Sequence, residues 1–313
     1  MRVLSGIIGM SVFMVLGLLG CGGGGGGGGT VAVSSSYKGN TAQATVTSSN
    51  AKVVSVDAVQ GAQDAATVGV LGKSATEIQE NSPQQLSIVK LLEDSIVHIS
   101  TNNISPNAVV GKTVDATVQS TQNGYSGSYS STINGNDATG AFSGTITFNS
   151  YREFSYSPAI SGNVAFSGVA NTSTSVITSL NMTISNLQGV IGSQSNTLNG
   201  SISVSNNGTI KTLNISLVRL DNVTNNTYWM KDFSFVLNGN AMTISGTYYD
   251  HVHGYVVVST VAPLTASTYS SNPTSGQLLF TGNNGTKARL TYTTLGYILE
   301  VDSSGNNTFV VIP

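Results

Sequence analysis

The sequence predicts a mainly β protein. We expect a large antiparallel meander, forming a barrel, half-barrel or sandwich, with one or two N-terminal helices packed on it. From residue 113 onward, short runs of alternating apolar and polar residues recur at roughly 8–12-residue spacing. Turn dipeptides separate these runs, and only 6 prolines interrupt the 313 residues.

Asn-Gly pairs mark the expected reversals, because Asn-Gly readily adopts the positive φ angles of tight hairpin turns. They occur at residues 123–124, 134–135, 199–200, 207–208, 238–239 and 284–285. Strands joined by tight turns are antiparallel neighbours. We expect strands at residues 113–121, 125–133, 140–149, 160–169, 178–187, 197–205, 209–219, 228–237, 240–249, 254–261, 276–282, 287–294, 296–301 and 307–312.

Several of these strands have one apolar and one polar face. Within 287–293, Ala288, Leu290 and Tyr292 alternate with hydroxyl or charged residues, which is typical of a sheet with one buried face. The strands within 125–149 carry Ser, Gly and Thr on both faces, as expected of an edge or rim. A sheet this wide accumulates twist, so we expect it to curl or close.

The segment 37–112, ahead of the sheet, is predicted to be partly helical. A first helix is expected over 51–68, which is rich in alanine and follows Asn50, a favourable N-cap residue. Gly61 interrupts this segment at a cost of about 1 kcal/mol.

A second helix is predicted over 83–99. Ser82, Pro83 and Gln85 supply an N-cap, a first-turn proline and a capping-box partner. The apolar residues from Leu86 to Ile99 recur at three- and four-residue steps, so they share one helical face. We expect that face to pack on the concave side of the sheet.

Composition excludes some partners. Only 8% of residues are charged and the formal net charge is −2, against about 25% charged residues in typical soluble domains. Without a basic patch, nucleic acid is not an expected partner. Low charge with many Ser and Thr residues is typical of exported β proteins.

Residues 1–20 have the features of a secretory signal peptide: an early charge at Arg2, an apolar run and small residues before the cleavage point. The segment ends in Leu18-Leu19-Gly20-Cys21, and Cys21 is the only cysteine of the chain. This ending resembles the lipobox of bacterial lipoproteins. The resemblance implies cleavage between Gly20 and Cys21, a diacylglycerol on the Cys21 sulfur, and acylation, typically by palmitate, of the new N-terminus.

A transmembrane anchor is the alternative for this apolar run. It is disfavoured because no basic or aromatic interfacial residues follow the run, and polyglycine does. Lipidation would consume Cys21, so no disulfide is expected.

Residues 21–36 are interpreted as the lipidated cysteine and a flexible linker. The polyglycine Gly22–Gly29 has a root-mean-square reach of roughly 15 Å. Gly22 stands where an Asp would imply retention at the inner membrane. The resemblance therefore favours the cell envelope, and within it the outer membrane of a Gram-negative bacterium. The remaining division is the partly helical segment 37–112 and an antiparallel β domain over 113–313.

Two groups are candidate ligand sites. His251 and His253, two apart on an expected strand, would point to the same face and could hold zinc or copper. A bend after Asp250 is the alternative. Residues 302–307 offer oxygen ligands for calcium, but with Asp302 as their single carboxylate a plain turn is favoured.

Four aromatic residues form a further candidate, since Tyr and Trp combine an apolar body with a polar tip suited to sugars or proteins. The alternative is that they fill the core. The predicted binding platform comprises Tyr228, Trp229, Tyr248 and Tyr249.

The motifs do not indicate an enzyme, and no cofactor is expected. Ser87 and Lys90 match a Ser-x-x-Lys pattern, but the partner motifs of that enzyme class are missing from the sequence. We expect a lipid-anchored envelope protein that is a binding or structural module for an envelope protein or a polysaccharide. The alternative is a periplasmic carrier that shelters a lipid or other apolar ligand in a half-barrel. A helix filling the concavity would favour the first.

Overall fold

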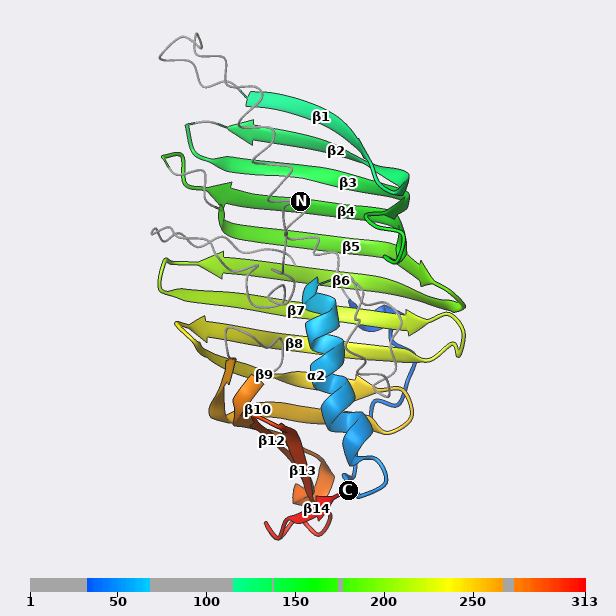
Figure 1. The fold of residues 1–313 in the computed structure, drawn as a ribbon, viewed down its shortest axis with the longest axis vertical. Coiled ribbons are helices and arrows are strands. Elements are labelled where there is room, and N and C mark those ends of the chain that lie inside the picture. Colours follow the sequence, from blue (N-terminus) through cyan, green and yellow to red (C-terminus); the bar gives the residue numbers. More distant parts are fainter. Residues whose placement is uncertain (1–32, 68–114, 137, 174–176, 267–272) are drawn as a thin grey trace, which may run out of the picture.

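The computed structural model describes residues 33–67, 115–136, 138–173, 177–266 and 273–313 (Figure 1). Within these ranges, fourteen strands form one antiparallel sheet in which every strand pairs with its neighbours in sequence. The edges of the sheet are β1 and β14, so it is not closed. The prediction of a mainly β antiparallel meander is confirmed.

Each expected strand has an observed counterpart within a few residues. Besides the helix α2 (Ala51–Thr67), the described part of the chain holds two short 3-10 turns, η1 (Val33–Ser36) and η2 (Asn283–Gly285). The strands are β1 (Asp115–Asn123), β2 (Ser126–Asn136), β3 (Ala141–Arg152), β4 (Ala159–Ala170), β5 (Ile177–Ile191), β6 (Gln194–Asn206), β7 (Ile210–Asp221), β8 (Thr227–Asn238), β9 (Ala241–Asp250), β10 (Gly254–Ala266), β11 (Pro273–Thr281), β12 (Lys287–Thr293), β13 (Gly296–Asp302) and β14 (Val310–Ile312).

Most of the Asn-Gly pairs lie at strand connections, but the pairs at 134–135 and 199–200 lie inside β2 and β6. For these two, the expectation of a reversal is wrong. Leu198 and Ile202 flank the second pair, and both are buried on the same face of the sheet. Burial of that face therefore outweighs the turn preference of the dipeptide.

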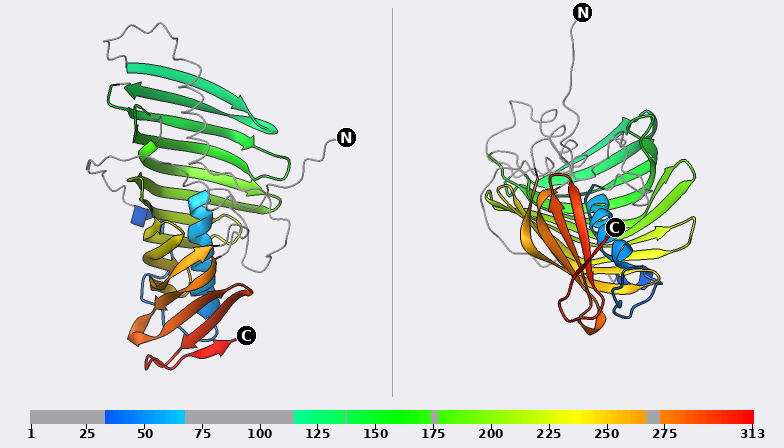
Figure 2. Two further views of the ribbon diagram at one scale, coloured as in Figure 1. Left: turned by 60° about the vertical axis from the view of Figure 1, so that its left-hand side comes forward. Right: turned by 60° about the horizontal axis from the view of Figure 1, so that its bottom comes forward.

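One face of the sheet holds the core. Ile146 on β3 pairs with Val164 on β4, and Val164 pairs with Ile184 on β5; at most 2% of each residue is exposed. Each buried methylene stabilises the fold by about 0.8 kcal/mol. The sheet curls with this face inside, so the core face is concave (Figure 2).

Helix α2 crosses the strands on the concave face (Figures 1 and 2). It contacts β7, β8 and β9, and also β12 and β13. Its inward residues Ala51, Val54 and Ala58 are fully buried in the same core cluster as the strands. The helix predicted over 51–68 is therefore present and fills this part of the concavity. The second expected helix, 83–99, lies outside the described residues.

Asn50 precedes α2, as expected of an N-cap, and its carbonyl accepts the Val54 N–H at 3.0 Å. Its side chain, however, binds backwards: Oδ1 accepts from Thr47 N–H and Nδ2 donates to the Thr45 carbonyl. The amide thus fixes the turn that leads into the helix. Beyond it, α2 continues through Gly61, although glycine has a weak helix propensity.

A line of irregularities, which we call the crease, bends the sheet. The strand pairing shifts register at Ser150 in β3, at Asn186 in β5 and at Asp232 in β8. All three residues have positive φ angles, of 48–53°. At β10 the ladder to β9 is interrupted, and the Thr260 hydroxyl bonds both the N–H and the carbonyl of Ile244 instead. Bulges bend a strand and increase its twist. Their alignment across neighbouring strands curls the sheet.

Glycine allows close approach along the crease. Gly246 on β9 has φ +152°, and a Cβ there would lie 2.7 Å from the Cα and ring of Phe233. Phe233 follows the Asp232 bulge and is fully buried. The glycine therefore permits the bend that turns this ring inward.

We expect Gly246→Ala to destabilise the protein by about 2–3 kcal/mol, through backbone strain and displacement of Phe233. Urea unfolding measures the loss. Gly135→Ala is the matched control, because a Cβ at Gly135 has open space, and its effect should stay within about 0.5 kcal/mol. Equal stabilities for the two variants would contradict the role of the crease.

Candidate binding surface

The convex face of the sheet carries three rows of cross-strand neighbours that are almost all Ser, Thr or Asn; we call them the hydroxyl–amide rows. The first row runs from β1 to β9 through Thr117, Asn134, Ser143, Ser167, Asn181, Ser203, Asn214, Ser234 and Ser245. The second runs from β1 to β7 through Gln119, Thr132, Thr145, Ala165, Thr183, Ser201 and Ser216. The third runs from β1 to β5 through Thr121, Ser130, Thr147, Asn163 and Ser185.

These rows form an uncharged, hydrogen-bonding surface. Their members are exposed or half-buried, and adjacent strands place them roughly 4.7–4.9 Å apart. Some bond within a row: Thr117 Oγ1 donates to Asn134 Oδ1 at 2.7 Å. Hydroxyls and amides both donate and accept hydrogen bonds. The rows can therefore donate hydrogen bonds to a partner and accept hydrogen bonds from it, without burying a charge.

The rows correct one expectation about the early strands. Ser, Gly and Thr were expected on both faces of 125–149, but Ile133, Phe142, Ile146 and Phe148 are all buried on the concave face. The hydroxyls of β2 and β3 mostly point to the convex face, apart from buried Ser131. Glycines within these strands obscured the alternation in the sequence.

Three aromatic residues lie in the connections from β1 to β2 and from β3 to β4, which are at the same end of the sheet (Figure 1). Phe154 and Tyr156 stack with ring centroids 5.4 Å apart and an interplanar angle of 8°. Tyr156 is 48% exposed, and Tyr125 in the neighbouring turn is 69% exposed. The Tyr125 N–H donates to the Arg152 carbonyl at 2.7 Å, which links the two connections. We call Tyr125, Phe154 and Tyr156 the aromatic rim.

Sequence reasoning missed the aromatic rim. Its signal was the alternation of aromatic and small residues between two strands, in Phe154-Ser155-Tyr156. This loop is a binding candidate because Tyr156 is exposed and stacks on the half-buried Phe154.

The structure divides the predicted aromatic platform between the two faces. Consecutive strand residues point to opposite faces. Tyr248 is 2% exposed in the concave core, and Tyr228 packs against the same core. Trp229 and Tyr249 stack on the convex face with centroids 4.8 Å apart. The four residues therefore do not form one surface.

On the convex face, Trp229 and Tyr249 hold the N-terminal segment. The Tyr37 ring packs on both, at 5.9 and 5.5 Å, and is 8% exposed. Its hydroxyl lies 2.9 Å from the Asn40 and Asp250 carbonyls, and burial raises its pKa well above the usual range. We call Tyr37, Trp229 and Tyr249 the aromatic clamp.

From the clamp the chain passes to the other side of the sheet. The Ala44 N–H donates to the Tyr255 carbonyl at 2.8 Å, and the Asn283 N–H donates to the Ala44 carbonyl at 2.7 Å. This segment thus lies between the start of β10 and the connection of β11 to β12. Ala44 and Val46 then join the concave core beside α2.

We expect Tyr37→Ala to release the segment from Trp229, the only tryptophan of the chain. Trp229 emission should move to longer wavelength, and acrylamide quenching should increase, because the indole loses its cover. Tyr37→Phe keeps the ring and should shift the emission less. Tyr297→Ala, at an exposed site in β13, should leave the spectrum unchanged. Unaltered emission in Tyr37→Ala would contradict the clamp.

A buried carboxyl group lies where α2 meets the sheet. Asp57 Oδ1 is buried with no hydrogen-bond partner among the described residues. Burial raises the pKa of Asp57 to about 6, and it outweighs attraction to Arg219 and Lys52; repulsion from Asp250 adds to the rise. The Arg219 guanidinium lies over the Tyr228 ring, 4.6 Å from its centroid. The ionised carboxylate therefore destabilises the contact between helix and sheet.

The pH dependence follows from this raised pKa. The folded state holds the Asp57 proton more tightly than the unfolded chain does. The ionised carboxylate therefore lowers the free energy of unfolding by its full amount above pH 6, and it has no effect below about pH 4. Asp57→Asn should stabilise the protein by about 1–2 kcal/mol at pH 7.5, after allowance for partial solvent contact. Denaturant unfolding at several pH values should show this gain vanish near pH 4.

Asp221→Asn supplies a control of opposite sign. Hydrogen bonds from Thr224 and Val223 outweigh burial and lower the pKa of Asp221, so its loss should destabilise the protein at pH 7.5. A pH-independent effect of Asp57→Asn would show that burial of its charge is not the cause.

The histidine pair lies in the turn between β9 and β10, not on a strand, so the alternation that would align the two rings does not apply there. His251 Nδ1 lies 3.3 Å from the Thr227 N–H, and the Asp250 carboxylate accepts the His253 N–H at 2.8 Å. Among the described residues, no group of three or more His, Cys, Asp or Glu side chains is placed to hold a metal.

Asp302 closes its own turn. Its carboxylate accepts the N–H groups of Ser304, Gly305 and Asn307. Burial would raise the pKa of Asp302, but these hydrogen bonds lower it below the usual value. The carboxylate oxygens that a cation would need are thus engaged by the backbone.

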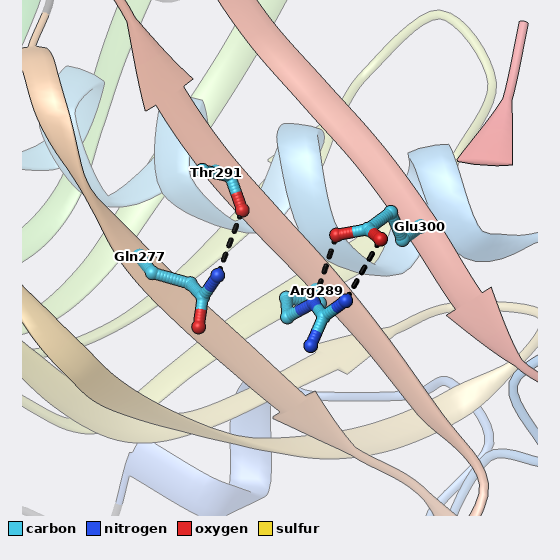
Figure 3. Close-up of polar contacts among 4 residues, drawn as sticks. All are labelled: Gln277, Arg289, Thr291 and Glu300. Atoms are coloured by element: carbon cyan, nitrogen blue, oxygen red, sulfur yellow. Dashed lines mark hydrogen bonds and ion pairs between the residues drawn. The ribbon is translucent and has the colours of Figure 1, made fainter. Parts of the chain in front are cut away.

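Polar side chains on β11, β12 and β13 bond to one another (Figure 3). Arg289 on β12 forms a two-bond ion pair with Glu300 on β13, both at 2.8 Å. Gln277 on β11 donates to Thr291 at 2.9 Å. The Arg289 guanidinium also lies 4.0 Å from the centre of the Phe309 ring. This end of the sheet is therefore charged and internally paired, unlike the hydroxyl–amide rows.

Gly20 and Cys21, the predicted cleavage and lipidation site, lie outside the described residues. Within the described ranges, no helix has the length and apolar character needed to cross a membrane. No family model matches the chain, and comparisons with curated proteins and with solved structures give no match.

Proposed function

We propose that this protein is a lipid-anchored component of the bacterial cell envelope, in the outer membrane, that acts as a binding module through its convex face. The observation that supports this most is the contrast between the two faces. The concave face is apolar, and α2 packs on it at β7–β9, β12 and β13, whereas the convex face presents uncharged hydroxyls and amides in register. Nothing in these rows favours nucleic acid, which needs basic groups.

The alternative, a half-barrel carrier of an apolar ligand, needs an open apolar concavity. Helix α2 occupies the concave side between β7–β9 and β12–β13. Val54 and Ala58 on the helix, and Leu217 on β7, are fully buried. This packing favours the binding module over the carrier.

The tether is compatible with a convex binding face. η1 contacts β6 and β7, and the clamp holds Tyr37 on the convex side, so the chain from Cys21 joins the body there. The segment from Cys21 to Val33 spans at most about 40 Å when extended, at roughly 3.3–3.6 Å per residue. This reach lets the body turn so that the rows face away from a lipid surface.

The anchor is tested by Cys21→Ser in the full chain. We expect the parent to incorporate labelled palmitate and to sediment with membranes. The variant should lose both properties and keep its signal peptide, because the cysteine sulfur is the acceptor of the lipid.

Gly22→Ala is the control, since it leaves the Leu-Leu-Gly-Cys sequence intact and should be labelled like the parent. A Cys21→Ser protein that is processed and membrane-bound like the parent, with label in neither, would refute lipid anchoring.

A further inference from the structure

We propose that the hydroxyl–amide rows and the aromatic rim form a binding site for a neutral polysaccharide. This inference deepens the proposed function and rests on it for the location of the protein. It names the ligand class and the residues that recognise it.

The absence of charge in the rows selects the ligand class. Sugar hydroxyls donate and accept hydrogen bonds, and so do Ser and Thr hydroxyls and Asn amides. An anionic or cationic polymer would bury its charges against these rows without a counter-charge, which is unfavourable. The ionic groups on β12 and β13 are paired with each other and lie away from the rows.

The repeat of the rows suits an extended polymer better than a small molecule. Equivalent side chains recur at every strand, and the first row continues across the sheet from β1 to β9. A chain of similar sugar units can therefore make similar hydrogen bonds along the row. Many weak contacts along one chain add up through high effective concentration.

The aromatic rim supplies the apolar component of sugar recognition. Pyranose rings carry C–H faces that pack on aromatic rings, while Tyr hydroxyls remain available for hydrogen bonds. Phe154 and Tyr156 lie nearly parallel, and of the three rows the third, with Thr121 on β1 and Thr147 on β3, is nearest in sequence to the connections that carry the rim. A polysaccharide lying along the third row would therefore run beside the strand ends that carry these rings.

A second copy of this chain, or another protein, fits the surface less well. Stable protein interfaces have an apolar, well-packed centre. The centre of the rows offers Ala165, with Val169 near the end of β4, among hydroxyls and amides. Such a surface lacks the buried anchors that protein partners use.

The test uses detergent-solubilised, full-length protein and affinity electrophoresis in gels containing cellulose ether, dextran or mannan, with alginate as the anionic polymer. We expect retardation by at least one neutral polymer and none by alginate. Sedimentation velocity on the same sample measures self-association.

Two sets of variants locate the site. Phe154→Ala combined with Tyr156→Ala should weaken binding by about tenfold or more, as expected for loss of aromatic anchors. Ser167→Lys combined with Asn181→Lys places charges in the first row and should weaken binding by a similar factor. Matched controls are Tyr297→Ala and Thr224→Lys, at exposed sites away from the rows, which should bind like the parent. Circular dichroism checks that each variant keeps its sheet.

Three results would overturn the inference: no retardation by any neutral polymer, retardation by alginate alone, or equal binding by the parent and both double variants. Concentration-dependent dimerisation that the row variant abolishes, without polysaccharide binding, would assign the face to a second copy. Palmitate labelling of Cys21 is measured separately, so failure of this inference leaves the proposed anchor standing.

Discussion

The architecture depends on the burial of one apolar face by a sheet that is too wide to stay flat. Fourteen strands give a continuous apolar surface from Tyr129 on β2 to Val301 on β13. If the sheet were flat and uncovered, this apolar face would be in contact with water. Here the sheet curls along the crease, and α2 provides the second layer for part of the interior. Curling and helix packing are thus two parts of one solution to the same burial requirement.

The N-terminal segment connects the two sides of the sheet. Tyr37 is bound on the convex face, whereas Val46 and Ala51 are buried in the concave core. The chain between them lies between β10 and the connection of β11 to β12, held by backbone hydrogen bonds on both sides. A pull on the tether would therefore reach the core through the aromatic clamp. This placement links the proposed anchor mechanically to the folded body.

The convex surface owes its chemistry to the same alternation that builds the core. Every second residue points outward, and in β1–β7 those positions are mostly Ser, Thr and Asn. Polar residues without charge keep this face solvated but leave it free of strong repulsion. Among the described residues, Arg289 pairs with Glu300, and Asp302 closes its own turn, so these charged groups are engaged locally.

The number, order and antiparallel pairing of the strands followed from the sequence, because period-two alternation and turn dipeptides are local signals. The helix over 51–68 was also visible in its alanine content. Local signals could not separate the Asn-Gly pairs that turn the chain from Asn199-Gly200, which lies inside β6. Whether such a pair turns or continues depends on burial across neighbouring strands. The Tyr228-Trp229 and Tyr248-Tyr249 pairs were predicted to form one platform. Adjacent strand residues point to opposite faces, so each pair is divided between the two faces of the sheet.

The sequence by itself determined the β meander, whereas lipidation of Cys21 stays a prediction. Only the tertiary structure decided that the sheet curls without closing, which side of it α2 covers, and how hydroxyls and amides align into rows. Rows are a property of register between strands, and register is set by bulges and by shared burial of the concave face. These are contacts between residues far apart in the chain, so no single segment of the sequence contains them.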